Sequence, residues 1–119
     1  EPLNSNHQRI ILNALKAVVQ ESSGTAYKLN IDNPNFVKIG GKTGTSQVIR
    51  IKEEDREEDL YKTKEIEDKF KDHSVLVGYA PIEDPKYIAS VIIENGGSGS
   101  AVAAPIAHKV LNFAYQENV

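Results

Sequence analysis

Hydrophobic residues recur at helical spacing near the start of the chain. The positions on this apolar stripe are Ile11, Leu12, Leu15, Val18 and Val19. Residues 5–8, Ser-x-x-Gln, have the form of a capping box, in which two side chains bond free backbone N–H groups at a helix start. The pattern predicts an amphipathic helix over residues 6–22, ended by Gly24.

Short apolar and β-branched runs predict strands in much of the remaining chain. Residues 36–51 predict one strand interrupted by glycines, and residues 74–80 and 87–94 predict two more. Residues 81–85 have a proline at each end, which predicts a hairpin turn with both prolines outside the ladder. Residues 32–35, Asp-Asn-Pro-Asn, predict another turn.

The last third of the chain predicts a glycine-rich break followed by a closing helix. The break covers residues 96–100 and the helix covers residues 101–116, with Pro105 tolerated either in the first turn or at a kink. Ser98 and Ser100 are the predicted caps of this helix. The order of elements predicts an α+β fold, an antiparallel sheet of about three strands flanked by N- and C-terminal helices.

Composition excludes several classes of function. The chain has 119 residues, enough for one domain or part of one, and a net charge of −3 without a basic stripe, so no nucleic-acid partner is expected. The absence of cysteine excludes disulfides, thiol catalysis and Cys-ligated zinc. No metal or cofactor is expected. The longest apolar run, residues 87–93, is too short to span a bilayer.

The charges are concentrated in one segment. Residues 50–72 hold ten of the 17 acidic and seven of the 14 basic residues, which accounts for the whole net charge. We interpret this segment as a solvated insertion, with a loop over residues 52–59 and a short helix over residues 62–70. A carboxylate metal site is the alternative, but EF-hand spacing is absent.

The sequence IGGKTGTSQV, at residues 39–48, admits two interpretations. Gly-Lys-Thr resembles a phosphate-binding loop, but such a loop needs a glycine where Phe36 stands and a helix directly afterwards. The alternating, β-branched residues that follow predict a strand instead. The phosphate interpretation therefore fails on both requirements.

The second interpretation is a strand that binds a carboxylate. Lys42 supplies charge, Thr43 and Thr45 supply hydroxyl donors, and Gly44 permits close approach of another backbone. Gln47 falls on the Thr43 and Thr45 face by alternation and is a candidate contact to a bound peptide. An ordinary half-exposed strand with the same residues remains the alternative at this point.

Lys-Thr-Gly is one of the motifs of penicillin-binding proteins and serine β-lactamases. Together, GGKTGTSQV and DHSVLVGYAPIEDPKYIASVIIENGGSGSAVAAPIAHKVL resemble the last third of a penicillin-binding transpeptidase domain of the high-molecular-weight, monofunctional class. KTKEIEDKFKDHSVLVGYAP resembles the elongation-specific branch of that class. The resemblance runs from about residue 10 to the end. It implies that residues 1–119 are a C-terminal piece of such a domain, with a partial transpeptidase-like fold.

The resemblance implies a role for each residue of the motif. Lys42 would orient and polarise the catalytic groups, and the hydroxyls of Thr43 and Thr45 would bind the terminal D-Ala carboxylate or that of a β-lactam. The backbone N–H of Thr45 would be the second oxyanion donor, and Gly44 would admit the substrate backbone. Strand alternation places Lys42 on the face opposite the threonines, so an edge strand and a long lysine stem are required.

The chain departs from the family by lacking two motifs. None of its eight serines has lysine three positions later, and Ser-x-Asn is also absent. The piece alone is therefore expected to be inactive. Two alternatives stay open. One is a non-catalytic module that binds peptide carboxylates, and the other is part of a serine β-lactamase or D,D-carboxypeptidase.

The resemblance also implies partners and a location. The expected partners are a peptidoglycan stem peptide ending in D-Ala-D-Ala, β-lactams for the parent protein, and the remainder of the transpeptidase domain. A homodimer through an exposed strand edge is a further expectation. The parent is expected at the periplasmic face of the bacterial inner membrane, anchored by an N-terminal helix outside this sequence.

The three histidines have no pattern that indicates catalysis. A structural role at the start of a strand is expected for His73. His7 and His108 are expected at the surface of their helices, because neither has a neighbouring acid and nucleophile in the sequence.

Overall fold

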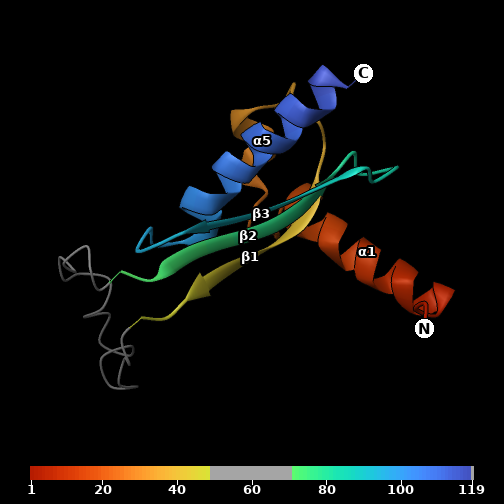
Figure 1. Cartoon of the computed structure of the whole chain (residues 1–119), viewed down its shortest axis with the longest axis horizontal. Helices are drawn as coiled ribbons and strands as arrows, with labels where there is room; N and C mark the ends of the chain where they lie inside the picture. Colours follow the sequence, from red (N-terminus) through yellow and green to blue (C-terminus); the bar gives the residue numbers. More distant parts are fainter. Residues whose placement is uncertain (49–70, 119) are drawn as a thin grey trace.

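A three-stranded antiparallel sheet organises the chain (Figure 1). The computed structural model describes residues 1–48 and 71–118. The strands are β1 (Gly40–Ser46), β2 (His73–Ala80) and β3 (Tyr87–Ile93), in the spatial order β1-β2-β3. The predicted antiparallel sheet is confirmed. The helix expected at residues 62–70 and the end of the first predicted strand lie outside the described residues.

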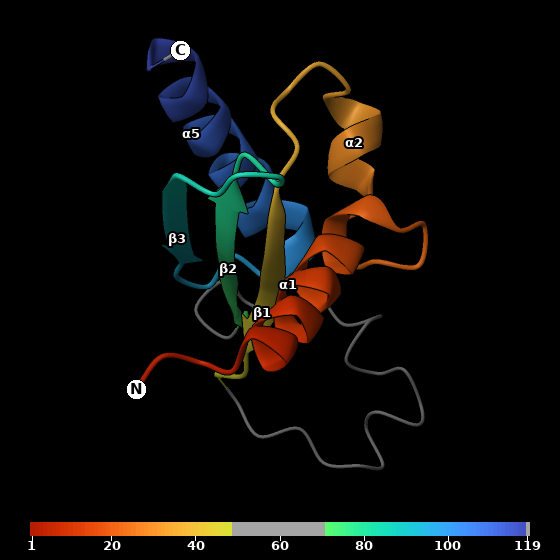
Figure 2. The ribbon, with the colours of Figure 1, turned by 90° about the vertical axis from the view of Figure 1, so that its right-hand side faces the viewer.

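The closing helix α5 (Ala104–Glu117) covers one face of the sheet (Figure 2). Leu76 and Ala80 of β2 point toward it and are fully buried. Leu111 of α5 lies over β2 at Gly78, where an added Cβ would lie 3.4 Å from the Leu111 Cδ1 atom. Small buried side chains on the helix and on the residue before it allow this close packing, and they are Ala104, Ala107 and Ala103.

The opposite face of the sheet exposes apolar side chains. Val77 is 47% exposed, Ile88 is 79% exposed and Ile92 is 63% exposed. Strand alternation explains the contrast, because residues that follow one another on β2 and β3 point to opposite faces. Apolar side chains gathered on one exposed face are typical of interaction surfaces.

The first helix, α1 (Ser5–Gln20), packs against β1 and extends away from the sheet (Figure 1). The predicted helix is confirmed, but the predicted capping box is wrong. Asn4 is the N-cap, and its side chain accepts a hydrogen bond of 2.9 Å from the Asn6 N–H. Ile11 was assigned to the packed stripe and is 48% exposed, because this half of the helix reaches beyond β1.

A second short helix, α2 (Lys28–Asp32), was not predicted. Leu29 contributes to the core at 3% exposure, and the Asn30 side chain donates a hydrogen bond of 2.6 Å to the carbonyl of Val19. A helix of five residues is too short to display a hydrophobic period. The turn predicted at residues 32–35 follows directly, with the Phe36 N–H bonded to the Asn33 carbonyl at 3.2 Å.

The hairpin between β2 and β3 has the predicted form. Pro81 and Pro85 both lie outside the ladder, and the Lys86 N–H closes the turn on the Ala80 carbonyl at 3.0 Å. Within the described residues, no helix combines the length and apolarity that a membrane crossing requires.

The closing helix begins with a π-helical turn, η2 (Gly99–Ala103), and Pro105 lies in the first turn of α5 as predicted. The predicted capping by Ser98 and Ser100 is wrong, because their hydroxyls bond to each other at 2.9 Å. Ser74 of β2 stabilises this helix start instead. Its buried hydroxyl donates to the Ser98 carbonyl at 2.7 Å and accepts from the Ala103 N–H at 2.9 Å.

Candidate functional site on strand β1

The Lys-Thr-Gly-Thr sequence lies in β1, at an edge of the sheet. Lys42 pairs with Val77 on the exposed face, whereas Thr43 and Thr45 pair with Leu76 and Ser74 on the opposite face. The predicted alternation is therefore confirmed. Among the described strands β2 alone pairs with β1, and an extended peptide binds in general by pairing with an unpaired strand edge.

The Lys42 ammonium lies close to the strand that carries it. The side chain is exposed, and its Nζ donates a hydrogen bond of 2.8 Å to the carbonyl of Thr43. This contact folds the lysine stem back along the strand toward the next residue. An exposed ammonium at an edge strand provides the positive charge that an anionic peptide end requires.

Thr45 is oriented by the turn before the closing helix. Its Oγ1 accepts a hydrogen bond of 3.2 Å from the Gly99 N–H, and the side chain is exposed. A hydroxyl has one hydrogen to donate in addition to its acceptor sites. Because Gly99 uses an acceptor site of Thr45, the O–H stays available to a carboxylate oxygen.

Thr43 contacts the loop between α1 and α2. Its Oγ1 lies 2.8 Å from the Thr25 Oγ1, at hydrogen-bond distance. Sequence reasoning missed Thr25, because a contact between residues 18 positions apart has no local signature. The strand register places Thr43 on the same face as Thr45.

Packing within the described residues does not require a glycine at position 44. An added Cβ would meet only the Val75 side chain, at an ordinary distance of 3.5 Å. Gly41 differs, because its added Cβ would lie 2.5 Å from the carbonyl oxygen of Val77. Packing within the described residues therefore explains the glycine at 41 and leaves the one at 44 without a structural reason.

Gln47 lies one residue beyond the end of β1 and is exposed. The strand alternation therefore does not extend to it, and its role as a contact to a bound peptide stays a prediction. Within residues 1–48 and 71–118, no group of three His, Asp or Glu side chains is arranged to hold a metal ion.

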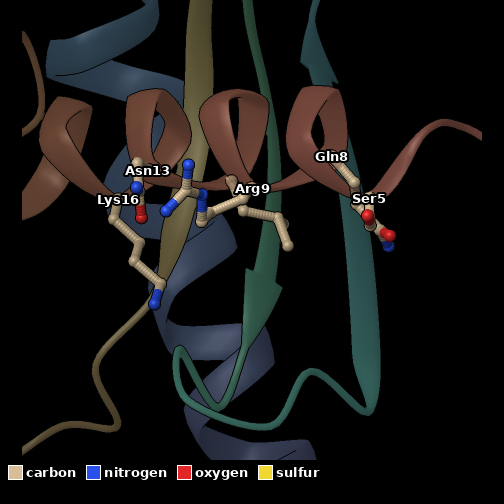
Figure 3. A pocket seen from close by; sticks show the side chains of 6 residues that line it. Ser5, Gln8, Arg9, Asn13 and Lys16 are labelled. Carbon is tan, nitrogen blue, oxygen red and sulfur yellow. The ribbon is translucent and has the colours of Figure 1, made fainter.

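The surface hollow shown in Figure 3 does not involve the β1 motif. It runs along one side of α1, where Arg9 and Lys16 extend outward. Lys16 lies 3.9 Å from the Glu83 carboxylate, and the Glu83 side chain is 85% exposed. An exposed ion pair of this kind contributes little to stability. All the residues that line the hollow belong to α1, so none comes from β1.

His108 is buried, so its predicted place at the helix surface is wrong; His7 is exposed as predicted. The His108 Nε2 lies 2.9 Å from the carbonyl of Val37 and must donate, while Nδ1 is buried without a hydrogen-bond partner among the described residues. Phe36 packs edge-on against the ring at 5.1 Å between centroids. The helical pattern did not reveal the burial of His108, because polar residues of a helix are usually assigned to the solvent face.

The burial of His108 makes stability depend on pH. Burial lowers the pKa of His108, and the bond to Val37 opposes this effect. As the pH falls through about 6.5, His108 takes up a proton in the unfolded chain, whereas in the folded chain it stays neutral to a lower pH. The free energy of unfolding therefore decreases as the pH falls below about 6.5. We expect His108→Gln, which keeps an N–H donor and does not titrate, to reduce the fall in unfolding temperature between pH 7.5 and 5.5. An unchanged fall would contradict this.

His73 makes a structural contact of the kind predicted. Its Nδ1 accepts a hydrogen bond of 2.9 Å from the backbone N–H of Asn95, at the end of the β2–β3 pair. Asp72, predicted in the solvated insertion, is only 8% exposed. Its carbonyl accepts from the Gly97 N–H at 2.8 Å, which ties the insertion's last residue to the glycine-rich turn.

Known proteins are similar to this chain in sequence. The relative from Haemophilus influenzae, named peptidoglycan D,D-transpeptidase MrdA, is 38% identical over 81% of the chain. The protein of the same name from Salmonella typhimurium strain SL1344 is 34% identical over 89% of the chain. The chain spans 14% and 16% of the length of these two relatives.

Solved structures share the fold. PBP2 from Helicobacter pylori, in complex with MreC, has a TM-score of 0.74 and 25% identity, covering 98% of this chain and 19% of that one. PBP2 from Pseudomonas aeruginosa, in complex with WCK 5153, has a TM-score of 0.69 and 29% identity over 93% of this chain and 20% of that one. The family model described as the penicillin binding protein transpeptidase domain matches residues 1–112. The chain therefore belongs to the penicillin-binding protein transpeptidase domain family.

Proposed function

We propose that the intact protein, meaning the longer protein that contains this chain, is a peptidoglycan D,D-transpeptidase. In this proposal β1 is the wall of the substrate groove that binds a terminal carboxylate. One observation carries it: the exposed Lys42 ammonium and the Thr45 hydroxyl lie on an edge strand, and Gly99 orients the hydroxyl for donation. The names of the relatives support the same activity.

The proposed reaction is acyl transfer through a serine ester. A serine outside this sequence attacks the carbonyl between the last two residues of a stem peptide ending in D-Ala-D-Ala, and the terminal D-Ala leaves. The amine of a second stem peptide then attacks the ester and releases the serine. The Thr45 N–H acts as an oxyanion donor, a role whose loss costs about 10²–10³ in rate.

The residues of β1 divide the recognition of the substrate between them. The hydroxyls of Thr43 and Thr45 donate to the carboxylate, and Lys42 supplies charge to the catalytic groups. Gly44 leaves room for the substrate backbone, in line with its lack of any steric requirement in the described chain. Gln47 is kept as a peripheral contact to the peptide stem. A β-lactam carboxylate occupies the same place as the terminal D-Ala carboxylate.

The partners and location follow from this function. The substrate is peptidoglycan, so the intact protein works at the periplasmic face of the inner membrane, anchored by a helix outside this sequence. The exposed sheet face with Val77, Ile88 and Ile92 packs against the remainder of the transpeptidase domain. When the chain is isolated from the rest of the domain, we expect two copies to pair along an exposed strand edge. Analytical ultracentrifugation would detect this dimer, and a monomer would contradict the expectation.

Labelling with a fluorescent penicillin tests the proposed function. We expect the intact protein to form a covalent adduct and the isolated residues 1–119 to form none, because the chain has neither Ser-x-x-Lys nor Ser-x-Asn. Titration of a D-Ala-D-Ala peptide into the isolated chain is expected to give no measurable binding. Labelling of the isolated chain, or no labelling of the intact protein, contradicts the proposal.

A further inference from the structure

Side chains of α5 bind both the backbone N–H and the backbone carbonyl of Val37. Its N–H donates to the Asn112 Oδ1 at 2.8 Å, and its carbonyl accepts from the His108 Nε2 at 2.9 Å. His108 and Asn112 are four residues apart, so they project from the same side of the helix one turn apart. Both polar groups of one residue are therefore bound by a single helix face.

The two side chains that hold Val37 are removed from water. His108 is 1% exposed and Asn112 is 7% exposed. A buried polar group that loses its partner keeps the full cost of desolvation, so these bonds have no favourable alternative in the folded protein. The two hydrogen bonds therefore fix the position of Val37 more firmly than bonds from exposed side chains would.

The next two residues are also held from outside the sheet. The carbonyl of Lys38 accepts from the Ile82 N–H at 3.0 Å, and the carbonyl of Ile39 accepts from the Gln20 side chain at 3.0 Å. Residues 37–39 precede β1 and belong to no ladder. Three different elements therefore fix three consecutive residues directly before the strand.

We propose that His108 and Asn112 are positioning residues for the Lys-Thr-Gly-Thr strand. The inference deepens the proposed function and rests on it. Lys42 follows Val37 by five residues, which is about 17 Å along an extended chain. In this proposal the side chains of His108 and Asn112, which bind Val37, therefore do not touch the substrate. They act by fixing where β1 begins, which sets the place of Lys42 and Thr45 at the edge of the sheet.

The physical reason is the small tolerance of acyl transfer. A displacement of about 1 Å in a group that contacts the reacting atoms can cost about 10² in rate. β1 is an edge strand, held in the sheet by β2 alone within the described residues. A fixed point at its beginning adds to the β1–β2 ladder in limiting sliding and tilting of the strand.

The test compares four variants of the intact protein. Asn112→Ala removes the acceptor for the Val37 N–H, and Asn112→Asp keeps an oxygen in the same place. His108→Leu removes the donor to the Val37 carbonyl. Leu111→Val is the matched control, since it weakens the core under the same helix but leaves both hydrogen bonds to the Val37 backbone in place. The measurements are the acylation rate constant with a fluorescent penicillin, the unfolding temperature, and amide hydrogen exchange of residues 37–46 and 87–93.

We expect Asn112→Ala and His108→Leu to lower acylation about tenfold and to speed exchange in residues 37–46 while residues 87–93 keep their protection. Asn112→Asp is expected to recover most of the rate. Leu111→Val is expected to stay within about twofold, at an equal or larger fall in unfolding temperature. Equal loss of rate in Leu111→Val, or no loss in Asn112→Ala, overturns the inference. If the unaltered protein forms no adduct, the proposed function fails instead.

Discussion

Replacing Lys42 with alanine in the intact protein is expected to lower the rate of acylation by a fluorescent penicillin roughly 10- to 150-fold. The range follows from a hydrogen bond to a charged group, worth about 1.5–3 kcal/mol, at about 1.4 kcal/mol for each factor of ten. Within the described residues the exposed ammonium bonds to the Thr43 carbonyl, a contact inside its own strand, so its removal costs little structure. The unfolding temperature is therefore expected to change by only a few degrees.

Lys38→Ala provides the control for this experiment. Lys38 is also exposed and lies just before β1. Its hydrogen bond to Ile82 uses the backbone carbonyl, so truncation of the side chain leaves that bond intact. Lys38→Ala removes one positive charge, as Lys42→Ala does. Acylation of Lys38→Ala is expected to remain within about twofold of the unaltered protein. A similar loss in both variants would mean that general electrostatic attraction, and not the position of Lys42, determines the rate.

Replacing Gly99 with alanine is expected to destabilise the transpeptidase domain by about 3 kcal/mol, at the upper end of the usual cost of overpacking. The added Cβ would collide with the carbonyl oxygen of Gly44 and lie 2.6 Å from that of Val75. Both obstacles are backbone atoms of paired strands, so the turn must move away from β1. This movement breaks the bond from the Gly99 N–H to Thr45, and acylation is expected to fall about tenfold.

Gly44→Ala is the matched control, because it adds the same methyl group on the other side of this contact. Its Cβ would meet only Val75 at 3.5 Å, so chemical unfolding should show a change below about 1 kcal/mol. Equal destabilisation by the two alanines would contradict the steric account of Gly99.

The strands and the two long helices could be predicted because their signals are local. The apolar stripe of α1 and the β-branched residues of β2 and β3 repeat with the periods of helix and strand. The Lys42–Thr45 motif was likewise visible, because four consecutive residues define it. Its place on an edge strand, with the lysine and the threonines on opposite faces, was confirmed by the register with β2.

The contacts that hold β1 in place could not be predicted from local patterns. Thr25, Gly99 and Asn112 meet Thr43, Thr45 and Val37 across separations of 18 to 75 residues. A polar residue in an amphipathic helix is normally assigned to the solvent face, and this rule misplaced His108. The predicted cap of the closing helix failed for a related reason, since Ser74 from a distant strand accepts the Ala103 N–H in place of Ser98 or Ser100.

The central claim is that the Thr45 hydroxyl donates to the substrate carboxylate, and one double comparison tests it directly. The acylation rate of the intact protein is measured with a penicillin and with its methyl ester, for the unaltered protein, Thr45→Val and Thr45→Ser. The account predicts that the preference for the free acid falls about tenfold or more in Thr45→Val and survives in Thr45→Ser. The same acid-to-ester ratio in all three proteins would contradict it.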